Sequence, residues 1–193
     1  MAPTPADGAA PPDSRERAVA ALERLVRDVP DFPEPGVLFK DITPVLADPD
    51  AFADVITALA AVGRDADGGV AVAVVVGLAA RGFLLGAPVA LALGVGFVPV
   101  RKAGKLPAAT HEVRYDLEYG SATLQLHQDA LSAGDRVLVG DDVLATGGTL
   151  AAAAELVARC GARVEAVSLL MELGFLDGRA ATADLRVESL IVV

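Results

Sequence analysis

Positive charge is scarce in this chain. Lys and Arg number 16 against 26 Asp and Glu, which gives a formal net charge of −10 at pH 7 over 193 residues. Proteins that bind nucleic acid or an anionic membrane depend on a basic surface, so this balance argues against both kinds of partner. Any anionic ligand must then be captured by a local cluster of basic side chains.

Cysteine and histidine are also rare. Cys160 has no second cysteine with which to form an internal disulfide, and we expect it to be a buried structural thiol in a protein of the reducing cytosol. His111 and His127 lack the paired spacing of metal ligands. The sequence therefore predicts a cytoplasmic protein without a histidine-based metal site.

Two segments raise the question of a leader or a membrane span. Residues 1–13 are rich in Pro and Ala and lack a charged stretch followed by an apolar one, which predicts a disordered tail and not a signal peptide. Residues 82–100 carry no charge, yet glycines and prolines divide this run into a short helix and a strand. We therefore expect no membrane partner, and a single domain over residues 14–193.

Helical and strand patterns alternate along the chain. Ser14 is expected to cap a first helix, and Asp48 with Pro49 to open a second. The further elements expected are a strand over 70–76, a helix over 84–93, strands over 97–101 and 136–139, a helix over 150–160 closed by Gly161, a strand over 163–171 and a last apolar run over 185–193. Such alternation predicts an α/β fold with a mainly parallel sheet flanked by helices. Apolar alternation on either side of a turn at 119–120 adds a hairpin that carries a long loop.

The segment at residues 137–149, VLVGDDVLATGGT, carries a chemical signal. Its turn offers backbone N–H groups and two hydroxyls at the positive end of a helix, which favours a phosphate monoester. The residues of this phosphate turn are Ala145, Thr146, Gly147, Gly148 and Thr149. Asp141 and Asp142, just before it, are placed to accept hydrogen bonds from two ribose hydroxyls. No Lys follows the glycines, which excludes an ATP-binding P-loop. The predicted ligand is a sugar phosphate, and the alternative is an ordinary strand–helix turn with a solvated Asp pair.

This segment resembles the 5-phosphoribosyl-1-pyrophosphate (PRPP) signature of type I phosphoribosyltransferases, in which two acidic residues precede a T-G-G-T-like turn. A second segment, DFPEPGVLFKDITPVL at residues 31–46, resembles an element of the adenine phosphoribosyltransferases. Its Pro and Gly content predicts a structured loop and not a helix. By the resemblance, Leu38, Phe39 and Lys40 bind adenine: the Phe39 ring stacks on the base and the main chain at Leu38 reads its edge. The alternative is a Pro-rich loop with Phe39 as a core plug.

Residues 77–83, GLAARGF, follow the expected central strand and place Arg81 at the carboxyl edge of the sheet. In the family the corresponding loop binds the pyrophosphate of PRPP, and the resemblance gives Arg81 that role. The sequence departs from the family at Ala79, where relatives usually have Asp or Glu.

Arg101, Lys102 and Lys105 form a basic cluster at the start of the long loop. The loop resembles the family's flexible lid, and by that resemblance Arg101 and Lys105 bind pyrophosphate. Ala103 is a second departure, because the family often has another basic residue there. Glu118 is by resemblance the acidic group near the imidazole edge of the purine.

The resemblance implies a type I phosphoribosyltransferase-like fold with a flexible hairpin lid and a small base-binding hood. It implies that adenine and PRPP give AMP and pyrophosphate in purine salvage, through an oxocarbenium-like transition state. Glu118, Arg81, Asp141 and Asp142 would be catalytic, with Mg²⁺ carried by PRPP and not held directly by the protein. A homodimer is implied. Two alternatives are a phosphoribosyltransferase for hypoxanthine, guanine or xanthine, and a non-catalytic protein of the same fold that senses PRPP or a nucleotide.

Overall fold

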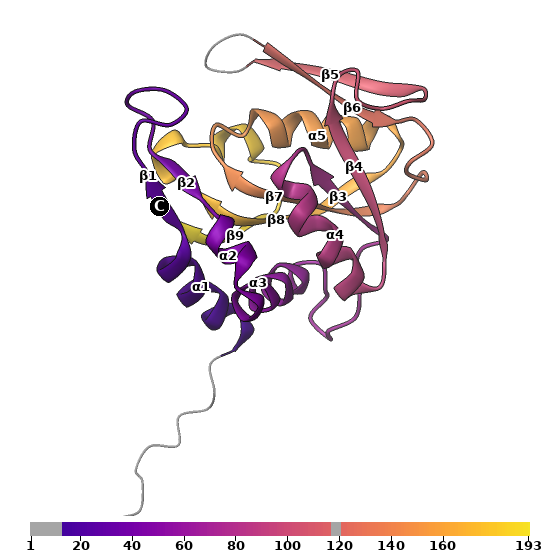
Figure 1. Ribbon diagram of the computed structural model, residues 1–193. Helices are drawn as coiled ribbons and strands as arrows, with labels where there is room; N and C mark the ends of the chain where they lie inside the picture. The colour runs from indigo at the N-terminus through magenta and orange to yellow at the C-terminus, as the bar shows by residue number, and fades with distance from the viewer. Residues whose placement is uncertain (1–12, 117–120) are drawn as a thin grey trace, which may run out of the picture.

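An open, twisted sheet runs through the molecule with helices on both faces, as the computed structural model shows (Figure 1). The structure describes residues 13–116 and 121–193. Within them, the main sheet has seven strands in the order β5-β6-β4-β3-β7-β8-β9. Their bounds are β3 Val74–Leu78, β4 Gly96–Lys102, β5 Thr110–Asp116, β6 Ser121–His127, β7 Arg136–Leu144, β8 Arg163–Glu172 and β9 Val187–Val192. The five strands from β4 to β9 are parallel, whereas β6 pairs antiparallel with both β4 and β5. The predicted mainly parallel sheet is confirmed.

Alternate residues of the central strands face opposite layers. Val75 and Leu138 pack in one core with α1 Ser14–Leu25, α3 Pro49–Ala61 and α4 Arg81–Leu93. Val74 and Val137 pack in the other core, which lies under α5 Gly148–Arg159 and the β5–β6 hairpin. Strands that are apolar on both faces in this way are typical of a sheet covered on both sides.

A small second sheet stands beside α1. Strands β1 Arg27–Val29 and β2 Phe39–Asp41 pair antiparallel, and the short helix α2 Thr43–Ala47 follows. The expectation that residues 31–46 form only a loop was therefore wrong. The reason is local: Asp41 accepts a hydrogen bond from Thr43 N at 2.8 Å, and Pro44 suits the first turn of a helix. The hydrogen bonds from Thr43, aided by Arg27, lower the pKa of Asp41 to about 2.

The first residues and capping residues of the helices agree only in part with the expected ones. Asp13, and not Ser14, caps α1, since its carboxylate accepts from Glu16 N at 2.8 Å and Glu16 accepts from Asp13 N in return. The cap of α3 by Asp48 is confirmed. Helix α4 begins at Arg81, three residues earlier than expected. Its capping residue, Ala80, makes no side-chain hydrogen bond to the helix, so no capping residue in the sequence marks this start.

Two strands also have other bounds than expected. The central strand β3 begins at Val74 and not at Val70, because Val70 forms an isolated antiparallel β-bridge with Arg64 instead. Strand β7 continues past Val139 to Leu144, where it still pairs with Glu172 of β8.

The uncharged run at 82–100 is divided between α4 and β4, as predicted. Among the described residues, no helix has the length and apolar character needed to cross a membrane. The predicted disordered tail, residues 1–13, lies outside the described residues except for Asp13.

Candidate active site

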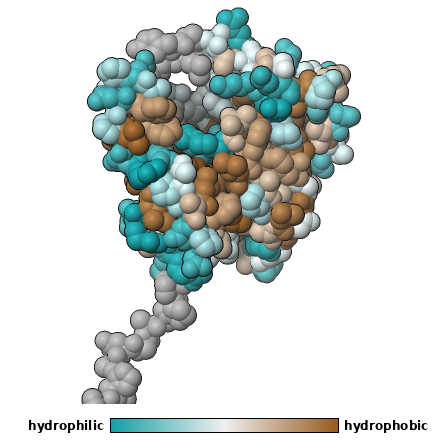
Figure 2. All heavy atoms as spheres, viewed as in Figure 1, coloured by the Kyte–Doolittle hydropathy of each residue, from teal (hydrophilic) through white to brown (hydrophobic). Residues whose placement is uncertain are grey.

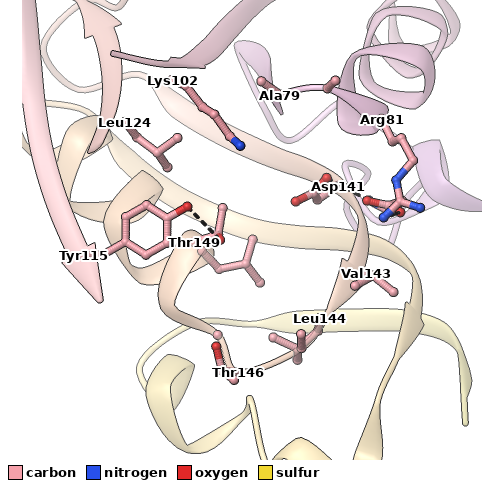
Figure 3. Close-up of a pocket in the computed structure, with 15 residues that line it drawn as sticks. Ala79, Arg81, Lys102, Tyr115, Leu124, Asp141, Val143, Leu144, Thr146 and Thr149 are labelled. Atoms are coloured by element: carbon pink, nitrogen blue, oxygen red, sulfur yellow. Dashed lines mark hydrogen bonds and ion pairs between the residues drawn. The ribbon is translucent and has the colours of Figure 1, made fainter. Parts of the chain in front are cut away.

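A pocket of about 380 Å³ opens where the carboxyl ends of the parallel strands meet the β5–β6 hairpin (Figure 3). The loop after β3 supplies Ala79 and Ala80, the first residue of α4 supplies Arg81, and β7 supplies Asp141 to Leu144. The remaining lining residues are Lys102, Tyr115, Leu124, Ala145, Thr146, Gly147, Thr149 and Leu150. Ligands of open α/β sheets bind at this edge.

The phosphate turn lies at the start of α5. Gly147 caps the helix in the left-handed conformation, with φ +84°, and Gly148 is the first helical residue. A residue with a side chain would be strained at Gly147. Thr149 Oγ1 donates to Tyr115 Oη at 3.3 Å, which joins the turn to the hairpin. The structure thus brings the predicted phosphate turn, apart from Gly148, into the pocket lining.

Asp141 and Asp142 lie inside β7 and not in a segment after its end, so the expectation that the strand ends before them was wrong. Their position is set by pairing with β8, which the sequence around them does not reveal. Asp142 is buried, and its Oδ2 lies 2.8 Å from Arg81 Nη2. A Cβ at Gly82 would lie 2.8 Å from Asp141 Oδ1, so only a glycine lets α4 come this close to the carboxylate.

Burial of the Asp141 carboxyl, followed by the negative charge of Asp142, raises its pKa well above the usual value. Arg81 and the N–H of Asp142, which donates to Asp141 Oδ1 at 3.0 Å, act in the opposite direction. The pocket therefore brings two carboxylates, Asp141 and Asp142, together with two basic side chains, Arg81 and Lys102.

Asp141→Asn is expected to stabilise the free protein at neutral pH. A carboxyl whose pKa is raised by folding makes the protein less stable as pH rises from about 4, its unfolded value, through the folded value. Asn removes this effect, so Tm at pH 7–8 should rise, about 2–4 °C for each kcal/mol gained. Thermal unfolding from pH 4 to pH 8 measures it, with the exposed Asp129→Asn as control. A Tm at pH 8 equal to or below that of the wild type would contradict the prediction.

The segment at residues 31–46 lies beside this pocket, where Phe39 contacts the lining residue Arg81. Arg81 Cζ lies 5.0 Å from the centroid of the Phe39 ring, and Phe32 contacts the same ring edge-on at 5.1 Å between centroids. Phe39 is partly exposed and Leu38 is 51% exposed, so Phe39 is not a core plug. Lys40 does not line the pocket. Its Nζ forms an ion pair with Asp28 Oδ1 at 2.7 Å, and the residue lines a separate cavity of about 260 Å³ beside α1.

The basic cluster is divided between the pocket and the loop. Lys102 lines the pocket, and Figure 3 shows its amine directed inward toward Asp141. Arg101 instead donates through Nη1 to Lys105 O at 2.9 Å, and neither Arg101 nor Lys105 is among the lining residues. Lys102 belongs to the basic cluster predicted from the sequence, but the pyrophosphate role was assigned to Arg101 and Lys105 and not to Lys102. Strand alternation gives the signal, since adjacent residues of β4 face opposite sides.

Other residues named from the sequence are placed as follows. Ala79 lines the pocket, and its peptide bond to Ala80 is cis. Ala103 N donates to Thr123 O at 3.0 Å, which ties the base of the loop to β6. Glu118 lies outside the described residues. Cys160 is half-buried at the end of α5, where burial raises the pKa of its thiol.

Comparison with known proteins identifies this arrangement. The model of the phosphoribosyl transferase domain family matches residues 43–186. An adenine phosphoribosyltransferase from a Nocardioides species is 64% identical over 169 residues, which is 88% of this chain and 91% of that protein. The chain belongs to the adenine phosphoribosyltransferase family. The resemblance carried by residues 31–46 and 137–149 is thereby confirmed.

Solved structures agree with the family and the fold. The adenine phosphoribosyltransferase from Thermoanaerobacter pseudethanolicus is 48% identical, with a TM-score of 0.85 over 91% of this chain and 99% of that one. The enzyme from Saccharomyces cerevisiae, complexed with an imino-altritol bisphosphate and adenine, is 41% identical, with a TM-score of 0.86 over 91% and 99%. The predicted type I phosphoribosyltransferase fold is confirmed.

Proposed function

We propose that the protein transfers the 5-phosphoribosyl group of PRPP to adenine and releases AMP and pyrophosphate, as a step of purine salvage. The observation that carries the proposal is the meeting of three features in and beside one pocket: the phosphate turn, the carboxylate pair on β7, and Arg81 against the Phe39 ring. The first two suit a ribose 5-phosphate, and the third lies where a base attached to that ribose would reach.

Each group has a task in this displacement. The purine nitrogen bonds to the anomeric carbon as the bond to pyrophosphate breaks, and positive charge develops on the ribose. Asp141 and Asp142 bind the ribose hydroxyls and stabilise that charge. Arg81 stabilises the departing pyrophosphate together with Lys102 in the pocket, Arg101 near the end of β4 and Lys105 in the loop that follows. Glu118 accepts the proton that adenine loses. Closure of the loop over 103–109 keeps out water that would hydrolyse PRPP.

The base site is proposed at Phe39, where stacking gives affinity and the main chain at Leu38 chooses the base. Arg81 lies against the Phe39 ring in the free protein while it also pairs with Asp142. Adenine that stacks on Phe39 therefore displaces the guanidinium from the ring. Binding of adenine thus frees Arg81 to contact the pyrophosphate of PRPP.

Magnesium is proposed to enter with PRPP. In the described part of the chain, no group of three or more His, Cys, Asp and Glu side chains could hold a metal ion, and Asp142 is already paired with Arg81. This donor set fits an ion that takes most of its ligands from PRPP oxygens and water, as Mg²⁺ commonly does. Once bound, the ion would neutralise charge on the pyrophosphate.

A cytoplasmic homodimer acting through one domain over residues 14–193 is part of the proposal. Helix α4 exposes Leu84 and Leu91, at 51% and 83%, and Figure 2 shows an apolar face over the region of α4. Exposed apolar patches of this kind mark contact surfaces, and a second copy would cover this one. Sedimentation of the purified protein measures the assembly directly.

Conversion of radiolabelled adenine tests the activity. With PRPP and Mg²⁺, we expect AMP to form far faster than the products from hypoxanthine, guanine or xanthine, because a 6-oxopurine leaves the base-reading groups at residue 38 unpaired. Faster conversion of a 6-oxopurine would overturn the base assignment. Binding of AMP without any turnover would favour the nucleotide-sensing alternative, which the relatives reported above, each an adenine phosphoribosyltransferase, do not favour.

Phe39→Ala is expected to raise the KM for adenine much more than the KM for PRPP. Of the two substrates, the ring is proposed to contact adenine alone, and a base–aromatic stack contributes about 1–3 kcal/mol. Initial rates with each substrate varied in turn separate the two constants. Phe175→Ala, which removes a ring that is 77% exposed, is the control. Equal weakening of both substrates would contradict a contact with the base alone.

A further inference from the structure

The phosphate turn is backed by the segment that follows β8. A Cβ at Gly147 would collide with Gly178 O and the Ala181 side chain, and a Cβ at Gly178 would collide with Ala145 O and the Leu144 side chain. The two backbones therefore approach each other more closely than any side chain would allow. Figure 3 shows the pale yellow C-terminal ribbon passing beneath Leu144 and Thr146.

A buried carboxylate holds this backing segment. Glu172, the last residue of β8, has a side chain only 10% exposed, and both of its oxygens accept from Arg179 Nε at 2.9 Å. Arg179 Nη2 lies 2.7 Å from Glu172 Oε2, and Nη1 donates to Val187 O at 3.0 Å. Ser189 Oγ also donates to Glu172 Oε2, at 3.2 Å. Because Arg179 directly follows Gly178, these bonds fix Gly178 to strands β8 and β9.

The rest of the segment is held at both ends. Leu173 N donates to Leu144 O at 2.9 Å, where the segment leaves β8. The buried Thr182, at the end of the 3₁₀ helix η2 Ala180–Thr182, donates through Oγ1 to Gly178 O at 3.2 Å. The 3₁₀ helix η1 Gly174–Leu176 lies between. Gly178 thus has little freedom to withdraw from the turn while the Glu172–Arg179 pair is intact.

We propose that Glu172 and Arg179 are positioning residues for the 5-phosphate of PRPP and AMP. Their ion pair presses Gly178 against Ala145 and Gly147, and so sets the spacing of the turn's N–H groups. The inference rests on the proposed function, since it requires the 5-phosphate at residues 145–149. Both PRPP and AMP carry that phosphate, whereas adenine does not. Loss of the ion pair therefore weakens PRPP and AMP together and spares adenine.

Glu172→Ala tests this role, because the half-exposed Arg179 that it leaves can be solvated. We expect the KM for PRPP and the Kd of AMP to rise by about tenfold, since small displacements of a binding group have effects of this order or larger. The KM for adenine should stay within about twofold of the wild type. Arg179→Lys, which keeps the charge but loses the two-pronged contact, should give an intermediate result. Glu165→Ala removes an ion pair to Arg163 near the other end of β8 and should change none of these constants.

Binding of AMP, measured by calorimetry, does not depend on turnover. If the wild type binds AMP but forms none from adenine, the proposed function fails while the positioning role is still tested by AMP affinity. Unchanged PRPP and AMP constants in Glu172→Ala would overturn the positioning role. A parallel rise in the adenine KM would also overturn it, because it would indicate general loss of structure. Should Glu172→Ala not fold, the same criteria apply to Arg179→Lys.

Discussion

Asp142→Asn is expected to lower kcat by roughly 30- to 1000-fold, or about 2–4 kcal/mol in the barrier, which is the typical cost of losing one electrostatic contact to a charged transition state. The substitution removes the negative charge that pairs with Arg81 and that the proposed function places beside the ribose as it becomes cationic. Asn keeps the shape of the side chain, and Arg81 is 37% exposed and can be solvated, so the fold should survive.

Steady-state rates at saturating adenine and PRPP, with near-UV circular dichroism to check folding, measure this effect. Glu188→Gln is a matched control, because it removes the charge from an exposed ion pair with Arg186, outside the pocket residues. A folded Asp142→Asn protein with kcat near that of the wild type would refute the assignment of Asp142 to the ribose.

Gly147→Ala is expected to have the second large effect. The new Cβ would meet Gly178 O, and alanine in a left-handed conformation costs about 1–2 kcal/mol in addition. The turn must shift to relieve the collision, so the KM for PRPP should rise by at least about tenfold.

Gly94→Ala separates strain from collision. Gly94 has φ +70° at the end of α4, and nothing lies within 4 Å of its Cβ position, so this variant carries strain alone. Both variants should lower Tm, but only Gly147→Ala should raise the KM for PRPP. An unchanged KM for PRPP in Gly147→Ala would show that the turn tolerates displacement and does not bind the 5-phosphate.

The parts of the site that could be predicted from the sequence are those whose functional groups lie within a few residues of each other in the chain. The phosphate turn depends on two glycines, two threonines and a following helix, all contiguous, and it lies at the pocket as expected. The base-binding role of Phe39 was predicted in the same way, from a continuous segment that resembles the family, and Phe39 lies against the lining residue Arg81. Such local patterns need no knowledge of how distant strands pair.

The missed features depend on long-range pairing. Strand β7 extends through Asp141 and Asp142 because β8 continues beside it, and the residues of β7 alone do not reveal this. Lys102 faces the pocket because of the register of β4 against β6, where it lies opposite Leu124. Gly178 follows in a later segment of the chain, and nothing near it in the sequence indicates that it touches the phosphate turn. Sequence patterns identify the groups that contact ligands better than those that hold them in place.

A structure of the protein with AMP bound tests the central claim most directly. We predict the phosphate on the N–H groups of residues 146–149, the ribose hydroxyls on Asp141 and Asp142, and adenine on the Phe39 ring in place of the Arg81 guanidinium. A phosphate bound elsewhere in the pocket, at Lys102 for example, with the ribose away from both carboxylates, would contradict the account.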